Sequence, residues 1–150
     1  MNLQVKKEHY FRRKYNSLNR FISYFYQVDL VSSLVSAGDS KILEVGVGSA
    51  FVSDYLKKIG YSVTTCDFDE RLKPDIIADV RSLDMGENVY DVVTAFEILE
   101  HIPFEDFEKT LNNLKGISSK FVIISLPLGF YFLFFFVDFQ FNPFFFYDNF

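Results

Sequence analysis

The sequence predicts a three-layer α/β fold, in which helices cover both faces of a mostly parallel sheet. Strand-like and helix-like segments alternate between residues 41 and 126, which is typical of this class. The segments 42–45, 91–96 and 121–125 are almost continuously apolar, as strands are when helices cover both of their faces. The chain has 150 residues, which is enough for one domain with one core.

Residues 1–40 predict a basic arm that leads into an amphipathic helix. Residues 1–20 carry six Lys or Arg against one Glu, a net charge of +5; since the whole chain is −5, the remainder is −10. The helix is expected to stop at Gly38. Helical spacing predicts the beginning of its apolar face, which consists of Leu18, Ile22, Phe25 and Val28.

Residues 41–127 predict the core of the fold, with helices between the strands. The first of these helices, Phe51–Ile59, is followed by Gly60, and another helix begins at Pro103. The expected strands are 42–45, 61–66, 75–78, 91–96 and 121–125.

The last residues, 128–150, form a tail of different composition. Eleven of the twenty phenylalanines lie in 127–150, which contains no Lys or Arg. Polar residues alternate with phenylalanine around Gln140, which is the period of a strand. The tail is therefore expected to form a hairpin at the sheet edge, with a turn at Asn142 and Pro143.

The composition disfavours several classes of protein. A net charge of −5 argues against a protein that wraps nucleic acid, so no such partner is expected. The single cysteine, Cys66, allows no internal disulfide, and with only His9 and His101 besides, no metal site is expected. Residues 1–20 lack the apolar run of a signal peptide, which predicts a cytoplasmic location.

The most informative stretch is KILEVGVGSA, residues 41–50. An apolar strand runs into Gly46 and Gly48, and a helix follows directly. Gly46 allows a tight turn, and Gly48 lets a ligand approach the backbone. Free N–H groups at the start of the helix then face that ligand. The alternative is a plain strand-to-helix turn without a ligand.

A dinucleotide fingerprint, G-x-G-x-x-G, fails here because Phe51 stands at its third glycine. The stretch instead resembles the E/D-x-G-x-G-x-G motif of class I S-adenosylmethionine-dependent methyltransferases, through Glu44, Gly46 and Gly48. Ala50 replaces the last glycine. The resemblance, closest to the type 11-like members, implies a Rossmann-like fold and S-adenosyl-L-methionine as cofactor.

The resemblance continues through residue 127. Asp67 follows the second strand, where the family has an acidic residue that accepts both ribose hydroxyls. The segment 77–80 resembles the motif whose acidic side chain, here Asp79, contacts the adenine amino group. Residues 91–102 resemble the fourth strand and its "LEH" signature, and 121–127 resemble the fifth strand.

The resemblance implies a set of cofactor-binding residues and one catalytic candidate, His101. His101 is either a general base or a structural cap before the helix at Pro103. Asp67 is alternatively an ordinary loop carboxylate, and Asp79 alternatively caps a turn. The residues implied to bind the cofactor are Glu44, Gly46, Val47, Gly48, Asp67, Phe68, Asp79, Val80, Phe96 and Glu97.

The family's sheet has two more strands after the fifth, preceded by a helix, and only 23 residues follow Pro127. These residues are too few for a helix and two strands of usual length. The resemblance therefore implies a chain shortened at its C-terminus, with a sheet incomplete at that edge. On this reading, residues 128–150 are an edge hairpin or a non-native end, for example from a shifted reading frame.

The leading interpretation is a methyltransferase that acts on a small-molecule acceptor. One alternative is a truncated module that binds the cofactor without catalysis; another is a nicotinamide-dependent oxidoreductase. A third is a membrane-associated protein that uses the basic arm and the Phe-rich tail, whose membrane association would be weak. The arm itself could bind phosphate or RNA, remain solvated, or fold Tyr10, Phe11 and Tyr15 over the cofactor as a lid.

Overall fold

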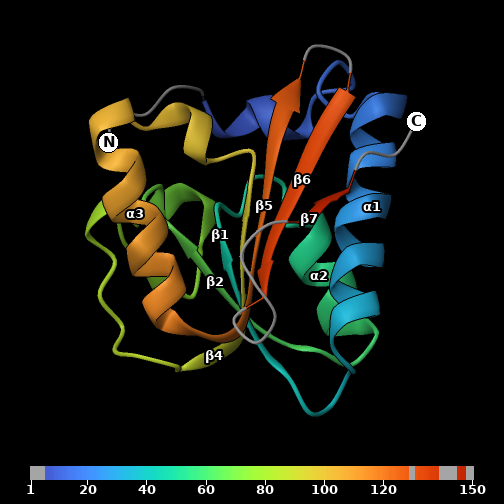
Figure 1. The fold of residues 1–150 in the computed structure, drawn as a ribbon. Helices are drawn as coiled ribbons and strands as arrows, with labels where there is room; N and C mark the ends of the chain where they lie inside the picture. The colour runs from blue at the N-terminus through green and yellow to red at the C-terminus, as the bar shows by residue number, and fades with distance from the viewer. Residues whose placement is uncertain (1–5, 129–130, 139–144, 148–150) are drawn as a thin grey trace.

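Figure 1 shows the fold in a computed structural model that describes residues 6–128, 131–138 and 145–147. The helical elements are η1 (Lys7–Phe11), α1 (Leu18–Leu34), α2 (Phe51–Lys58), η2 (Glu70–Leu72), η3 (Val80–Ser82), η4 (Leu99–His101) and α3 (Phe104–Ile117). The strands are β1 (Lys41–Val45), β2 (Ser62–Asp67), β3 (Ile76–Ile77), β4 (Tyr90–Phe96), β5 (Ser118–Leu128), β6 (Tyr131–Asp138) and β7 (Phe145–Tyr147).

The described strands form one sheet in the order β3-β2-β1-β4-β5-β6-β7. All pairings from β3 to β5 are parallel. α1 and α2 lie on one side of the sheet and α3 on the other (Figure 1). These three layers confirm the predicted Rossmann-like α/β fold with a mostly parallel sheet.

The C-terminal edge of the sheet is built differently from the rest. Two residues separate β5 from β6, which pairs with it antiparallel. β7 in turn pairs antiparallel with β6. A return this short leaves no room for a crossover helix. The turn predicted at Asn142 and Pro143 lies outside the described residues.

The core fills both faces of the parallel strands, which explains their continuous apolar sequences. Ile42 on β1 faces the side covered by α1 and α2, where it joins the same cluster as Leu56. Its neighbour Leu43 faces the other side and joins the cluster that includes Leu114 of α3. Ile42, Leu43 and Leu114 are fully buried, so both faces are sealed from water.

The predicted apolar face of α1 is wrong in its first half. Leu18 is 75% exposed and Phe25 63% exposed, and Ile22 is also exposed. The buried side of α1 instead carries the polar Ser23 and Gln27, and Tyr24, Leu30 and Val31 join the helix to the core. The reason lies in the tertiary structure. Helical spacing identifies an apolar stripe but not the side of the helix that packs on the protein, and the first half of α1 lies beside the cavity described below.

The described helices include none that is both long and apolar enough to cross a membrane.

Candidate functional site

The glycine loop joins β1 to α2 at the carboxyl edge of the sheet. The backbone N–H of Gly46 donates to the carbonyl of Cys66 (2.8 Å), which extends the pairing of β1 with β2 by one residue. Gly46 has φ +87°, a left-handed conformation that side chains rarely adopt. The chain therefore turns away from the sheet directly after β1.

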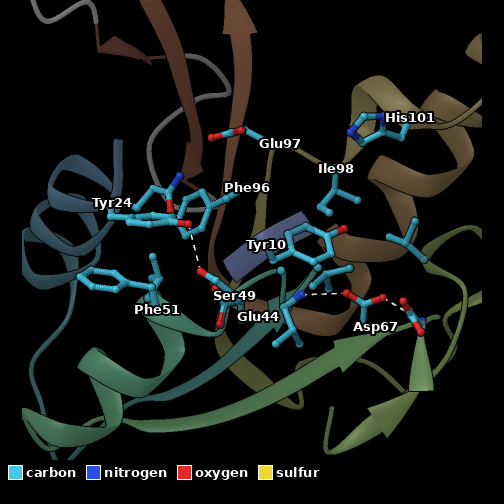
Figure 2. Close-up of a pocket in the computed structure, with 18 of the residues that line it drawn as sticks. Tyr10, Tyr24, Glu44, Ser49, Phe51, Asp67, Phe96, Glu97, Ile98 and His101 are labelled. Atoms are coloured by element: carbon cyan, nitrogen blue, oxygen red, sulfur yellow. Dashed lines mark hydrogen bonds between the residues drawn. The ribbon is translucent and has the colours of Figure 1, made fainter. Parts of the chain in front are cut away.

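Asp67 lies at the end of β2, against this loop (Figure 2). Its Oδ2 accepts a hydrogen bond from the backbone N–H of Val47 (2.9 Å), and its Oδ1 accepts one from Asp69 (2.9 Å). Burial raises the pKa of the Asp67 carboxyl, while these N–H groups act in the opposite direction. Each carboxylate oxygen keeps a further lone pair for another donor.

Glu44 is a buried acid inside β1. Among the described residues, none donates a hydrogen bond to its Oε2. Burial raises the pKa of Glu44 to about 7, and Ser53 opposes that shift through hydrogen bonding. A buried carboxyl oxygen without a partner is costly, so Glu44 is suited to receive a donor from a ligand.

A cavity of about 300 Å³ opens over the glycine loop. It lies at the carboxyl ends of β1, β2 and β4, which is where open α/β sheets place their ligands. The sequence-predicted residues that line it are Glu44, Gly46, Val47, Gly48, Asp67, Phe68, Val80, Phe96, Glu97 and His101.

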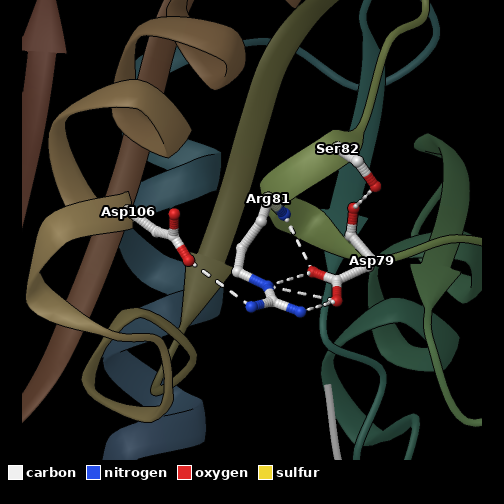
Figure 3. Close-up of polar contacts among 4 residues, drawn as sticks. All are labelled: Asp79, Arg81, Ser82 and Asp106. Atoms are coloured by element: carbon white, nitrogen blue, oxygen red, sulfur yellow. Dashed lines mark hydrogen bonds and ion pairs between the residues drawn. The ribbon is translucent and has the colours of Figure 1, made fainter.

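Asp79 is not among the lining residues, although its neighbours Ala78 and Val80 are. Its carboxylate forms an ion pair with Arg81 (Oδ2 to Nη2, 2.6 Å) and accepts the backbone N–H of Arg81 at the start of η3 (Figure 3). Arg81 also reaches Asp106 of α3 (3.4 Å). Arg81 holds the pKa of Asp79 well below its usual range. This geometry matches the capping alternative for Asp79.

α1 contributes a wall of the cavity that the sequence pattern does not predict. Arg20, Tyr24 and Gln27 line it, at a spacing that places them on one helix face. Arg20 forms an ion pair with Glu97, and the Ser23 hydroxyl donates to the other oxygen of that carboxylate (3.3 Å). The helical spacing of these residues does not single them out, because the neighbouring apolar stripe has the same period.

Aromatic rings close the cavity above the loop (Figure 2). Tyr24 stacks on Phe51 (4.7 Å between ring centres), and its hydroxyl lies 3.0 Å from the Ser49 hydroxyl. Tyr10 and Tyr15 also line the cavity, and a Cβ on Gly48 would lie within 4 Å of the Tyr10 ring and of the Tyr15 hydroxyl. Arg20 lies over the Tyr15 ring, 4.5 Å from its centre, as in a cation–π contact.

His101 lines the cavity at the end of η4. Its side chain is 45% exposed, and its Nε2 lies 3.8 Å from a carboxylate oxygen of Glu100. Burial raises the pKa of Glu100. The His101 ring is thus accessible from the cavity and has an acid beside it. Its role as a base stays a prediction.

No group of three or more His, Cys, Asp or Glu within the described residues could hold a metal ion.

The fold and the site together define a Rossmann-like α/β protein, with a glycine loop after β1 and an acid after β2 at the edge where such sheets place their ligands. The sequence profile of the family described as "Methyltransferase domain" matches residues 43–120. The match covers more than half of the chain, so the chain belongs to this methyltransferase family. The family expected from the sequence is thereby confirmed.

Known proteins similar to this chain include the ubiquinone biosynthesis O-methyltransferase of Pseudomonas fluorescens, 30% identical over 94 residues. That match covers 51% of this chain and 40% of the relative, so the chain spans about two fifths of the relative's length.

Among solved structures, a protein from Pyrococcus horikoshii has a TM-score of 0.66 at 16% identity, covering 81% of this chain and 66% of its own. The Haemonchus contortus phosphoethanolamine N-methyltransferase, solved with phosphoethanolamine and S-adenosylhomocysteine, has a TM-score of 0.59 at 18% identity and covers 69% and 25%. At these identities the likeness shows the fold.

Proposed function

We propose that this chain binds S-adenosyl-L-methionine and takes part in methyl transfer to a small molecule. The observation that carries the proposal is the contact between the glycine loop and Asp67, at the mouth of a cavity that Glu44 also lines. A backbone loop beside one acid suits a ribose, and a second buried acid suits a cation. Family membership supports the same ligand.

The residues present fit the parts of this cofactor. The free lone pairs of Asp67 suit the two vicinal ribose hydroxyls, since each hydroxyl needs one acceptor. Glu44 suits the ammonium group, which would supply the missing donor. Ala78 and Val80 give the adenine ring a lining without charge, because Asp79 is engaged by Arg81.

When bound, the cofactor supplies a methyl group on a positively charged sulfur, which is a good leaving group. The protein's own part is mainly to align donor and acceptor and to exclude water. Tyr24 and Phe51 supply apolar ring surface toward the cavity. Glu97 is held by Arg20 and Ser23, so its carboxylate has a fixed position at the cavity wall.

The acceptor atom we propose is a hydroxyl oxygen. The ubiquinone biosynthesis relatives are named O-methyltransferases, which favours oxygen over nitrogen or carbon. A hydroxyl must lose its proton as it is methylated, and an imidazole titrates in the right range for that task. His101, accessible at the cavity, is the proposed proton acceptor.

Calorimetric titration with S-adenosylhomocysteine tests the cofactor proposal. We expect binding by the unchanged chain and a loss of at least tenfold in affinity for Asp67→Asn, whose amide accepts with one oxygen only. Asp39→Asn is the matched control, because Asp39 is exposed and does not line the cavity. Absence of binding by the unchanged chain, or equal affinity in both variants, would refute the proposal.

Transfer of a labelled methyl group to a panel of small hydroxyl compounds tests the reaction. His101→Asn should lower turnover at least a hundredfold and leave the affinity for S-adenosylhomocysteine unchanged. Full turnover by His101→Asn would remove His101 from the proposed role. Binding without any turnover in the unchanged chain would contradict the catalytic part of the proposal.

A further inference from the structure

The outer face of α1 carries apolar side chains where water is expected. Leu18, Phe21, Ile22 and Phe25 are all exposed and stand at helical spacing, so they form one stripe along the first half of the helix, which we name the α1 stripe. The opposite, buried side of the helix carries Ser23, Tyr24 and Gln27. A contiguous apolar patch of this kind marks an interaction surface.

Three consecutive exposed cations, Arg12, Arg13 and Lys14, directly precede this stripe. The turn that carries them is compact, because the backbone N–H groups of Tyr15 and Asn16 both donate to the carbonyl of Arg12. Ser17, which directly follows this turn, caps α1. The cations are therefore held at the beginning of the helix that bears the stripe, although the chain beyond residue 20 is strongly acidic.

We propose that the α1 stripe and these three cations dock on the surface of an anionic lipid bilayer. Apolar side chains on one helix face insert at the interface, while neighbouring cations bind acidic headgroups. Only Phe21 and Phe25 of the stripe could stack on bases, because Leu18 and Ile22 are aliphatic, whereas all four side chains can insert at a lipid interface. A second copy of the chain that docked through the same patch would bring its own Arg12, Arg13 and Lys14 against these cations, whereas acidic lipids provide countercharge.

The surface reaches the rim of the cavity. The Phe21 ring contacts the Phe51 ring edge to face, with 5.4 Å between ring centres, and Phe51 lines the cavity. Docking would thus bring the cavity rim to the lipid surface. This inference stands apart from the methyl-transfer proposal, because vesicle binding is measured without cofactor or acceptor.

Flotation of the purified chain with vesicles tests the inference. We expect binding to vesicles that contain phosphatidylglycerol and at least tenfold weaker binding to pure phosphatidylcholine. Leu18→Gln with Phe25→Gln should weaken the binding to anionic vesicles at least tenfold. Arg12→Gln with Arg13→Gln should remove most of the difference between the two kinds of vesicle.

Matched controls test whether the effects belong to this surface. Phe104→Gln removes an aromatic ring that is 90% exposed at the beginning of α3. Lys58→Gln with Lys109→Gln removes two exposed cations elsewhere. Neither control should change flotation, and equal melting temperatures would show that all variants remain folded.

Four results would overturn the inference. These are no flotation by the unchanged chain, equal binding to neutral vesicles, unchanged binding of the stripe variant, and equal losses in the controls. Gel filtration of the same proteins tests for binding of a second copy of the chain, and titration with RNA tests for binding of nucleic acid. If self-association or RNA binding depended on the α1 stripe and no vesicle binding were seen, the partner of the stripe would be a second copy or RNA and not a lipid surface.

Discussion

The two walls of the cavity are held in different ways. On the sheet side, backbone N–H groups of the loop make the contacts: Gly46 donates to the carbonyl of Cys66, and Val47 donates to the carboxylate of Asp67. On the α1 side, side chains far apart in sequence make the contacts, above all Arg20 with Glu97. The sheet-side wall therefore follows from strand pairing, whereas the α1 wall depends on individual side chains.

The largest expected effect is on the sheet-side wall. Gly46→Ala would place a Cβ against the Ile98 side chain and would force a left-handed conformation on a residue with a side chain. Strain and overpacking together should cost about 4 kcal/mol of unfolding free energy. Chemical denaturation measures the loss, and titration with S-adenosylhomocysteine should show at least tenfold weaker binding.

One further variant separates crowding from backbone strain as causes of that loss, and a second serves as a control. Adding Ile98→Ala to Gly46→Ala should recover the part of the loss that comes from crowding and leave the part that comes from φ. Gly116→Ala is the control, since Gly116 lies within α3 with nothing within 4 Å of an added Cβ. It should stabilise the protein by about 0.5–1 kcal/mol. A stable Gly46→Ala protein would contradict the rigidity assigned to this wall.

The next effect concerns pH and Glu44. Its pKa in the folded protein, about 7, lies above the ordinary value of 4.5, so folding favours the protonated form. The stabilisation is complete below pH 4.5 and is lost as the pH rises through about 7. Glu44→Gln should be flat over this window and, at pH 8, more stable than the unchanged chain by on the order of 3 kcal/mol.

Denaturant titrations at several pH values measure this difference. The same carboxylate should attract the ligand's ammonium group once ionised, so the affinity for S-adenosylhomocysteine should rise from pH 6 to pH 8. This rise should be absent in Glu44→Gln. Parallel pH profiles for the two proteins would show that Glu44 titrates normally.

On the α1 side, the ion pair should contribute less. The side chains of Arg20 and Glu97 are 22% and 12% exposed, so solvent partly screens their attraction. Arg20→Gln should cost about 2 kcal/mol, because Glu97 would lose its charged partner in a half-buried site. A double-mutant cycle with Glu97→Gln measures the coupling, and purely additive losses would mean that the pair does not hold this wall.

The smallest effect should come from the Tyr24 hydroxyl. Tyr24→Phe removes its hydrogen bond with Ser49 and keeps the ring that stacks on Phe51. The loss should be about 1 kcal/mol, as for one hydrogen bond. Tyr55→Phe, which removes the hydroxyl of a tyrosine that is 46% exposed, is the comparison variant. A Tyr24→Phe protein with unchanged stability would indicate that the ring alone makes this contact.

The sequence by itself determined the parallel half of the fold and the sheet-side wall. Apolar runs identify buried strands, and parallel pairing brings Gly46 and Asp67 to one edge, so the pattern alone places the loop beside the acid. Asp79 was the exception: its carboxylate pairs with Arg81, and Arg81 is also held by Asp106 of α3, a contact that depends on where α3 lies.

Only the tertiary structure decided which side of α1 faces the protein. Leu18, Ile22 and Phe25 satisfy the helical period as well as Arg20, Tyr24 and Gln27 do, and the sequence carries no signal that chooses between them. The choice follows from long-range contacts, because Glu97 lies far along the chain from Arg20 and Ser23 and joins them only in the folded state. Local periodicity fixes the existence of a helix, whereas its rotation is set by the surface against which it packs.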